Sequence, residues 1–299
     1  MSNTKSAFNI KDLEHISGIK AHTIRIWEKR YNILQPSRTE TNIRLYSLES
    51  LQKLLNITLL HNHGYKISKI ATYPEETIPS LVKEIFSPNN SKNHAINSFK
   101  VAMLQFDRQL FLKTYDSMLA QRSFREIFNN VFIPLLNEIG VLWQTQTITP
   151  AHEHFISSLI RQKLILNIDK IQSETLITGD RTLIFYLPAN DNHEMGLLYM
   201  HYEAILNGYK TVYLGADVTL EDLKNTLAFH KDATFVTYFT LLPEDLSIEE
   251  YFSAFSREIL EGTGATLWAS GCKVLYTSDK QPDSGISIIH SFADYIKRL

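Results

Sequence analysis

The chain has 299 residues, of which 44% are hydrophobic and 21% are charged, and its formal net charge at pH 7 is −2. This length predicts two or three domains of ordinary size, and the composition excludes a long low-complexity or disordered region. No stretch approaches the roughly 20 apolar residues of a membrane-spanning helix, and the first residues lack a signal-peptide pattern, so we expect a cytoplasmic protein without a membrane partner. The single cysteine, Cys272, excludes an internal disulfide and a zinc cluster of several thiolates.

The charges are distributed unevenly along the chain. Residues 1–73 carry 11 Lys and Arg against 5 Asp and Glu, a net charge of +6, whereas the remaining residues carry 19 basic against 27 acidic side chains, a net charge of −8. A small basic head on an acidic body indicates that a polyanion such as nucleic acid binds the head alone.

Residues 8–34 predict two helices joined by a tight turn at Ser17 and Gly18, because apolar residues recur at helical spacing on both sides of the turn. In the second helix Ile24 and Trp27 would pack inward while polar residues face outward, the division that a helix in the DNA major groove requires. The following stretch, "QPSRTETNIRLYS", combines turn-forming residues with alternating apolar ones and predicts a short hairpin wing. A small helical interaction domain with a solvated basic face fits the same composition and periodicity.

The segment "TIRIWEKRYNILQPSRTETNIRLYS" strongly resembles the winged-helix DNA-binding domain of the MerR family of transcriptional regulators, and the resemblance covers about residues 8–73. It implies a helix-turn-helix followed by a wing, bound as a dimer to an inverted-repeat operator in double-stranded DNA. The residues at the positions that it implies for DNA contact are His22, Thr23, Arg25, Arg30, Tyr31, Arg38, Arg44 and Tyr46.

From residue 78 to residue 171 the pattern is helical and predicts a bundle. The expected amino-terminal helix caps are Asp107, Ser123 and Thr149. Trp143 ends one predicted helix, and after nine residues Glu153 and His154 follow near the start of the next. The simplest interpretation is that Trp143 is a core aromatic residue and that Glu153 and His154 are surface residues. However, this W-x9-EH spacing resembles the motif of helical domains that cap cobalamin in MerR-type cobalamin sensors. The resemblance places the three residues over the upper face of the corrin, where the adenosyl group sits.

Five strand-like runs alternate with helical ones from residue 182 onward and predict a parallel, doubly wound sheet of flavodoxin-like type. The five runs are "TLIFYLP", "KTVYLG", "ATFVTYFT", "ATLWASG" and "ISIIH". Ligands of such sheets bind beyond the carboxyl ends of the strands, which is where the loop "NDNHEMG" follows the first run.

Within this loop, His193 is a candidate metal ligand. A ligating imidazole needs an acceptor on its other ring nitrogen, and Asp191, two residues before it, suits that role. Gly196 removes a side chain where a large flat ligand must approach the backbone. A histidine in a loop is more often solvated than ligating, but the strand before this loop and the helix after it favour the ligand role.

In this setting the loop resembles the cobalamin-binding domain of methionine synthases, corrinoid methyl-transfer proteins and cobalamin-sensing MerR regulators. The resemblance implies that His193 replaces the cofactor's dimethylbenzimidazole as the lower axial ligand of cobalt, with Asp191 as its orienting partner and the freed nucleotide tail buried in the sheet. The later "YLGADVTL" also matches. Nearly the whole chain thus resembles light-dependent, adenosylcobalamin-binding repressors of carotenoid synthesis.

Three positions depart from the family pattern. Tyr238 stands where the family has the Ser of an S-x-L element, and Ser270 with Gly271 replaces a Gly-Gly pair. Both changes predict a narrower channel for the nucleotide tail. Gln144 replaces the His that follows the capping Trp in photoreceptor members, which removes their light-dependent ligand. The implied cofactor-binding set is Trp143, Glu153, His154, Asp191, His193, Gly196, Tyr238, Ser270 and Gly271.

These patterns predict three domains: a winged-helix DNA-binding domain over residues 1–75, a helical capping bundle over 76–175 and a flavodoxin-like cobalamin-binding domain over 176–299. The predicted function is a non-enzymatic MerR-type repressor whose DNA affinity and assembly, as a dimer or tetramer, are set by adenosylcobalamin or another cobalamin, with light as an additional input. Two alternatives remain open. The sensor half is a cobalamin-independent remnant for dimerisation or for binding an antirepressor protein, or the chain is a corrinoid methyl-transfer protein.

Overall fold

The computed structural model describes residues 7–62, 64–84, 91–144, 147–240, 247–274 and 284–299. Its contacts divide the chain into two compact units, Met1–Ile160 and Arg161–Leu299. Each unit is described by itself below. The predicted three-domain division at residues 75 and 175 stays a prediction.

The first unit begins with the predicted winged helix-turn-helix. Its elements are α1 (Ile10–Ser17), α2 (Ala21–Tyr31), the hairpin strands β1 (Ser37–Arg38) and β2 (Arg44–Leu45), α3 (Leu48–Asn62) and α4 (Ile67–Ile70). Helix α1 starts at a capping box between Asn9 and Asp12 and ends at Gly18, whose φ of +75° favours glycine. The apolar face that α1 and α2 share is buried, with Ile24 fully inaccessible to solvent. Sequence periodicity thus predicted this head correctly.

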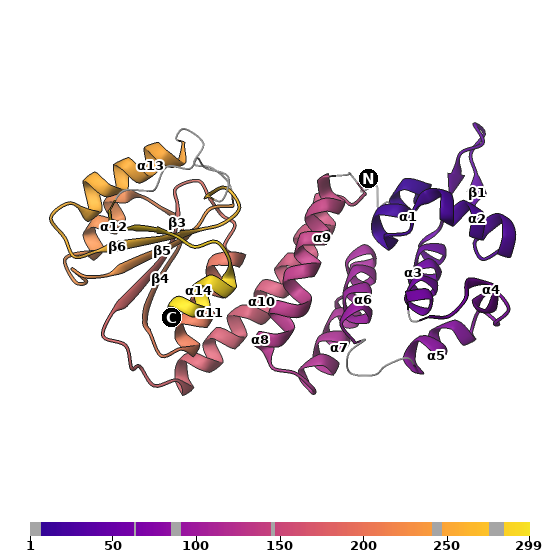
Figure 1. The fold of residues 1–299 in the computed structure, drawn as a ribbon, viewed down its shortest axis with the longest axis horizontal. Helices are drawn as coiled ribbons and strands as arrows, with labels where there is room; N and C mark the ends of the chain where they lie inside the picture. Colours follow the sequence, from indigo (N-terminus) through magenta and orange to yellow (C-terminus); the bar gives the residue numbers. More distant parts are fainter. Residues whose placement is uncertain (1–6, 63, 85–90, 145–146, 241–246, 275–283) are drawn as a thin grey trace. The chain divides into compact units, whose positions relative to one another are not determined.

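The remainder of the first unit is helical. Its elements are α5 (Thr77–Glu84), α6 (Ser91–Gln105), α7 (Arg108–Leu119), α8 (Phe124–Ile127), the π-helical turn η1 (Phe128–Phe132), α9 (Ile133–Gln144) and α10 (Pro150–Glu174). Asp107 caps α7 through the amide of Leu110, and Ser123 caps α8, as predicted. The core is aromatic, with Phe99 lying 5.0 Å from Phe111 and 5.4 Å from Phe132 between ring centroids. Helix α10 continues into the second unit (Figure 1).

The second unit contains a five-stranded, all-parallel sheet in the order β4-β3-β5-β6-β7, as the doubly wound prediction requires. Its strands are β3 (Thr182–Pro188), β4 (Lys210–Val218), β5 (Thr234–Tyr238), β6 (Thr266–Ser270) and β7 (Ile286–Ile288). The helical elements are α11 (Met195–Leu206), α12 (Leu220–Thr226), α13 (Ile248–Phe255), η2 (Ser256–Leu260) and α14 (Phe292–Arg298). None of the described helices combines the length and the hydrophobicity that crossing a bilayer requires.

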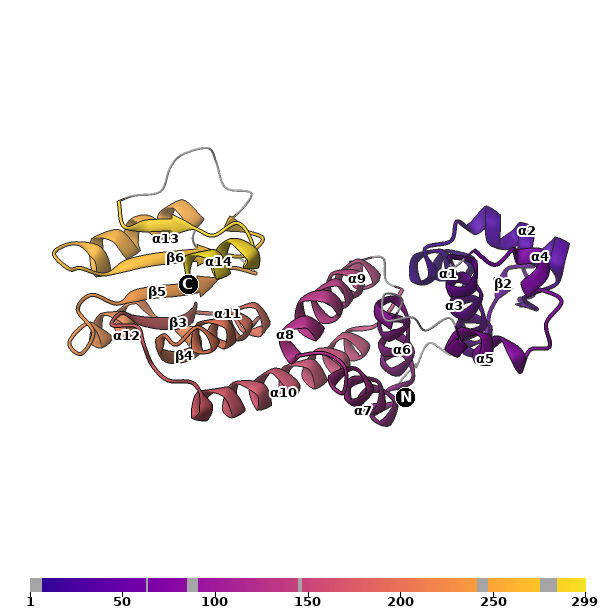
Figure 2. The same cartoon turned by 60° about the horizontal axis from the view of Figure 1, so that its bottom comes forward.

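The sheet separates two apolar cores, so both of its faces are covered. One core contains Leu223 of α12 and Tyr251 of α13, and the other contains Met200 of α11 and Tyr295 of α14. Figure 2 shows the same layers after a turn of the molecule. Strand β3 pairs with β4 on one side and β5 on the other, so the chain reverses its winding direction at β3. The loop after β3 therefore lies at the switch point where ligands of such sheets bind.

Backbone hydrogen bonds around Gly271 join the carboxyl ends of β5 and β6. The amide of Phe239 donates to the carbonyl of Ser270 at 2.8 Å, and the amide of Lys273 donates to the carbonyl of Phe239 at 3.3 Å. Gly271 has a φ of +107°, and a Cβ there would lie 2.6 Å from the amide nitrogen of Phe239 and 2.7 Å from its carbonyl carbon. The predicted site residue Gly271 therefore has a structural reason to be glycine.

We expect Gly271→Ala to lower the free energy of unfolding by at least about 2 kcal/mol, because both the backbone conformation and the approach of Phe239 oppose a Cβ. Gly262 is a matched control, since it has a φ of +75° but no atom within 4 Å of its added Cβ. Gly262→Ala should cost only about 1 kcal/mol, the penalty of the left-handed conformation alone. Urea-induced unfolding of the full chain measures both losses, and equal losses would contradict the steric argument.

Candidate functional site

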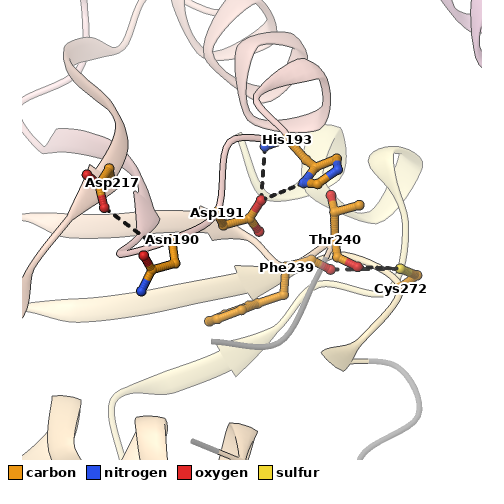
Figure 3. Close-up of polar contacts among 7 residues, drawn as sticks. All are labelled: Asn190, Asp191, His193, Asp217, Phe239, Thr240 and Cys272. Atoms are coloured by element: carbon orange, nitrogen blue, oxygen red, sulfur yellow. Dashed lines mark hydrogen bonds and ion pairs between the residues drawn. The ribbon is translucent and has the colours of Figure 1, made fainter. Parts of the chain in front are cut away.

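The loop after β3 holds His193 against a buried carboxylate. Oδ1 of Asp191 accepts from the backbone amide of His193 at 2.9 Å and lies 2.9 Å from Nδ1 of its imidazole ring (Figure 3). The side chain of Asp191 is 5% exposed, whereas that of His193 is 52% exposed. The amide of Asn190 donates to Asp217 at 3.0 Å, which fastens the loop to the end of β4. The aspartate therefore orients an imidazole that stays accessible.

This pair presents one metal-binding nitrogen. With Nδ1 as the donor to the carboxylate, Nε2 carries the lone pair of a neutral imidazole. The second carboxylate oxygen of Asp191 is buried and has no hydrogen-bond partner among the described residues. Across the part of the chain that the structure describes, no three His, Cys, Asp or Glu side chains gather into a group able to hold a metal ion. A lone oriented imidazole suits a metal whose other ligands come from a macrocycle, so these residues fit the cobalt of a corrinoid.

Tyr238 fills the space against Gly196. A Cβ on Gly196 would lie 2.7 Å from Cδ1 and Cε1 of the Tyr238 ring. The ring is also stacked on Phe292 of α14, with 5.8 Å between centroids and 9° between planes. Burial raises the pKa of the Tyr238 phenol. Gly196 was predicted to let a flat ligand approach, and here the flat group that it accommodates is the ring of Tyr238. On the side of Gly196 where a Cβ would stand, a ligand would need the space that this ring occupies.

Ser270 and Gly271 complete the rim formed by the ends of β5 and β6. Tyr238 and Ser270 are partners in the β5–β6 register, so the three predicted residues of this rim are neighbours. The buried hydroxyl of Ser270 donates to the carbonyl of Ile289 at 3.0 Å and thereby supports the chain after β7. Cys272 places its thiol 3.5 Å from the carbonyl of Thr240 (Figure 3). In this structure the Ser270 hydroxyl therefore stabilises the carboxyl end of the sheet.

Glu194 is a site residue that sequence reasoning missed. Its carboxylate is 2.7 Å from the guanidinium of Arg161 on α10 and accepts from the hydroxyl of Tyr213 on β4 at 3.2 Å. Burial, followed by the charge of Glu194, raises the pKa of Tyr213. The residue after His193 therefore fixes the loop to α10 and β4. Its position beside His193 was the available signal, but partners 33 and 19 residues away could not be read from the sequence.

The predicted capping residues lie at one end of the helical region in the first unit. Trp143 in the last turn of α9 is 54% exposed, which is unusual for a large aromatic side chain and excludes the core interpretation. In the first turns of α10, Glu153 accepts from the hydroxyl of Ser157 at 2.7 Å and lies 2.9 Å from Nδ1 of His154. The chain turns back after α9, since the amide of Thr147 donates to the carbonyl of Leu142 at 2.9 Å. The side chain of Gln144 lies outside the described residues.

The predicted DNA-contacting residues divide into exposed and supporting groups. His22, Arg25 and Arg30 of α2 are exposed, and Arg38 at the wing is also exposed. Thr23 and Tyr31 are partly exposed, and the guanidinium of Arg30 lies 5.6 Å from the centroid of the Tyr31 ring.

Tyr46 differs from this expectation because it is fully buried. Its hydroxyl donates to Glu28 at 2.8 Å, and Glu28 also binds the guanidinium of Arg44 at 2.9 Å. Glu28 of α2 thus joins the second helix to the wing through both residues. Burial keeps the Tyr46 side chain from an external ligand, so its role in this structure is to support the wing.

Comparisons with known proteins agree with this arrangement. Residues 8–76 match the model of the MerR HTH family regulatory proteins, and residues 95–166, which cover much of the helical region, match the model of the B12 binding domain. The fold resembles the Methanosarcina barkeri monomethylamine corrinoid protein, with a TM-score of 0.56 and 15% identity over 69% of this chain and 97% of that one. This likeness shows a shared fold.

Two curated relatives share most of their length with this chain. The HTH-type transcriptional repressor CarH of Myxococcus xanthus is 28% identical over 232 residues, which cover 75% of this chain and 76% of that protein. The HTH-type transcriptional repressor CarA of the same organism is 28% identical over 216 residues, which cover 70% of this chain and 68% of that protein. The chain thus joins a MerR-type helix-turn-helix domain to a B12-binding domain and is a homologue of these repressors.

Proposed function

We propose that this protein is a MerR-type transcriptional repressor whose binding to operator DNA is controlled by a bound cobalamin. The observation that carries the proposal is the buried carboxylate of Asp191 orienting the accessible imidazole of His193, in a chain that also bears a basic helix-turn-helix head. The relatives named above are repressors and not enzymes, and the regulatory role follows that of the relatives. The likeness to a corrinoid protein concerns the fold, so it gives no support to methyl-transfer chemistry.

The head would bind double-stranded DNA through α2 and the wing. The exposed side chains of His22, Arg25 and Arg30 on α2 suit contacts with base edges and phosphates in the major groove, with Thr23 and Tyr31 beside them. Arg38 suits a phosphate contact from the wing, whose geometry Arg44 and Tyr46 support through Glu28. An inverted-repeat operator would require at least two copies of the chain, one for each half-site.

His193 would hold the cobalt through Nε2, with Asp191 orienting the ring. Trp143, Glu153 and His154 would help to cover the cofactor, and the exposed tryptophan would supply a large apolar surface for it. A bound adenosylcobalamin supplies a light-sensitive cobalt–carbon bond. The chain's own part is to orient the imidazole, cover the ligand and keep water from it.

Cofactor binding would change assembly and thereby DNA affinity. Residues proposed to hold one ligand come from 76–175 and from 176–299, so a bound cobalamin would tie these proposed domains together and favour a particular homo-oligomer, a dimer or a tetramer. More heads in one assembly raise the effective concentration of each head at its half-site. The coupling is reciprocal, so operator DNA would strengthen cofactor binding by the same factor.

One observation favours a second candidate function. The Tyr238 ring packs on Gly196 and Phe292, so it fills the space beside Gly196 where a flat ligand was expected to fit. A chain in which this ring never moves would be a cobalamin-independent repressor, with the second unit serving dimerisation or an antirepressor protein. The two candidates differ in whether the purified chain binds a corrinoid.

We expect His193→Ala to weaken binding of hydroxocobalamin by at least about tenfold and to abolish the spectrum of a histidine-bound cobalt, because the axial nitrogen is removed. Asp191→Asn should weaken binding by about tenfold, since the ring loses its charged acceptor. Absorption titration of the full chain measures both effects. His230→Ala is the control and should leave the spectrum and the affinity unchanged. His230 lies just before the amino end of β5, whereas His193 follows the carboxyl end of β3. An unaltered His193→Ala spectrum would remove this residue from the ligand role.

We expect Tyr238→Ala to raise the affinity for hydroxocobalamin by about tenfold, because no stacked ring then has to leave Gly196 and Phe292, a contact of about 1 kcal/mol or more. Tyr238→Phe keeps the ring and should bind like the unmodified chain. The same titration reports both variants. If neither the unmodified chain nor Tyr238→Ala binds a corrinoid while both bind operator DNA, the cobalamin-independent function is correct.

We expect Arg25→Ala to weaken operator binding by about 1–3 kcal/mol, since the exposed guanidinium on α2 is placed for a base or phosphate contact. Arg257→Ala, an exposed arginine of the second unit paired with Glu258, is the charge-matched control and should have no effect. Fluorescence anisotropy with labelled operator DNA, at two salt concentrations, measures the loss. Equal effects of the two variants would mean that the basic head does not provide the specific contact.

A further inference from the structure

The first helix of the DNA-reading head is completed by a side chain from the helical region. The carbonyl of Ile16 lies in the last turn of α1, where backbone carbonyls lack partners within the helix. It accepts a hydrogen bond of 3.3 Å from the ammonium of Lys100 on α6, 84 residues away in the chain. Lys100 is only 7% exposed. A buried positive charge thus stands at the carboxyl end of α1, where the helix dipole favours it.

Lys100 also connects this helix end to α9. Its ammonium forms an ion pair with Glu138, a residue of α9 five positions before Trp143. A buried ammonium requires both a countercharge and hydrogen-bond acceptors, so Glu138 and the Ile16 carbonyl support the same side chain. Helices α1, α6 and α9 therefore meet at one charged group within the first unit.

A second polar contact lies next to the first one. Nδ1 of His15 on α1 is 3.1 Å from the hydroxyl of Thr147, which is fully buried in the connection between α9 and α10. This connection joins Trp143 to Glu153, the residues proposed to cover the cofactor. The helix-turn-helix therefore contacts the short segment between the capping residues directly.

A pocket with both polar and apolar lining residues lies beside these two contacts. A cavity of about 410 Å³ lies between the two sides, lined by Ile16 and Gly18 of the head and by Lys100 and Leu142 of the helical region. The hydroxyl of Thr58 on α3, which also lines the cavity, is buried without a hydrogen-bond partner among the described side chains. The two polar contacts therefore lie beside a pocket, where they hold α1 against the helical region in addition to its buried apolar side chains.

We propose that Lys100 and the His15–Thr147 pair are positioning residues that couple the cofactor cap to the DNA-reading head within one chain. A ligand held against Trp143 and Glu153 fixes the connection that contains Thr147, and His15 passes this restraint to α1. Lys100 holds the carboxyl end of α1 in a fixed position when α9 shifts. This inference rests on the proposed function, and it adds a route to DNA that does not require a change in oligomeric state.

The test measures the coupling between cofactor and operator in the full chain. Operator affinity is determined with and without adenosylcobalamin in the dark, and the ratio of the two affinities is the coupling. His15→Ala and Thr147→Val should each reduce this ratio at least about threefold while the corrinoid spectrum stays unchanged. The double variant should lose no more than either single variant, because both remove the same contact. Thr114→Val on α7 is the matched control, because the Thr114 hydroxyl donates to the carbonyl of Leu110 in the same helix.

A second measurement needs no cofactor. Amide hydrogen exchange of α1 in the ligand-free chain should accelerate at least about fivefold in Lys100→Met and in Thr147→Val, but not in Thr114→Val. Unchanged exchange in both variants would overturn the contact itself. If the chain binds cobalamin but His15→Ala and Thr147→Val leave the ratio of operator affinities unchanged, the proposed coupling route is wrong and the proposed function stands. An unmodified chain that binds no corrinoid would overturn the proposed function, and the coupling with it.

Discussion

The second unit depends on one hydrogen-bonded pair, in which the buried carboxylate of Asp191 holds the accessible side chain of His193. The carboxylate of Asp191 accepts from both the backbone and the ring of His193, so one buried acidic group sets the loop and the imidazole together. The loop can take this form because β3 ends at the switch point of a doubly wound sheet. The sheet positions the loop, and the loop leaves the imidazole of His193 accessible.

Local patterns predicted the parts of this arrangement that depend on near neighbours in the chain. The five strands, the helix-turn-helix turn at Gly18 and the pairing of Asp191 with His193 all lie within short sequence windows. Contacts between distant residues were not predictable in this way. The ring of Tyr238 on Gly196 and the bond from Lys100 to Ile16 join positions 42 and 84 residues apart, and only tertiary packing brings them together.

Two of the three residues that depart from the pattern of the resembling family, Tyr238 and Ser270, are used for packing and hydrogen bonding in this structure. Tyr238 stacks between Gly196 and Phe292, and Ser270 secures the chain that follows β7. Gly271 stays glycine because the backbone of Phe239 approaches it closely. Substitution at the rim of the sheet has therefore been absorbed by neighbouring side chains, while the loop that carries His193 keeps its hydrogen bonds.

The continuity of helix α10 fixes the spacing between two of its residues, Glu153 and Arg161. It is one continuous helix of 25 residues, with Glu153 near its start and Arg161, the partner of Glu194, eight residues later. Each residue of an α-helix adds about 100° of rotation and 1.5 Å of rise. Removing or adding one residue between these two positions would turn Glu153 to a different side of the helix relative to Arg161, even if every side chain were conserved. A substitution along this stretch leaves the angular spacing of the two residues unchanged, whereas an insertion or a deletion alters it.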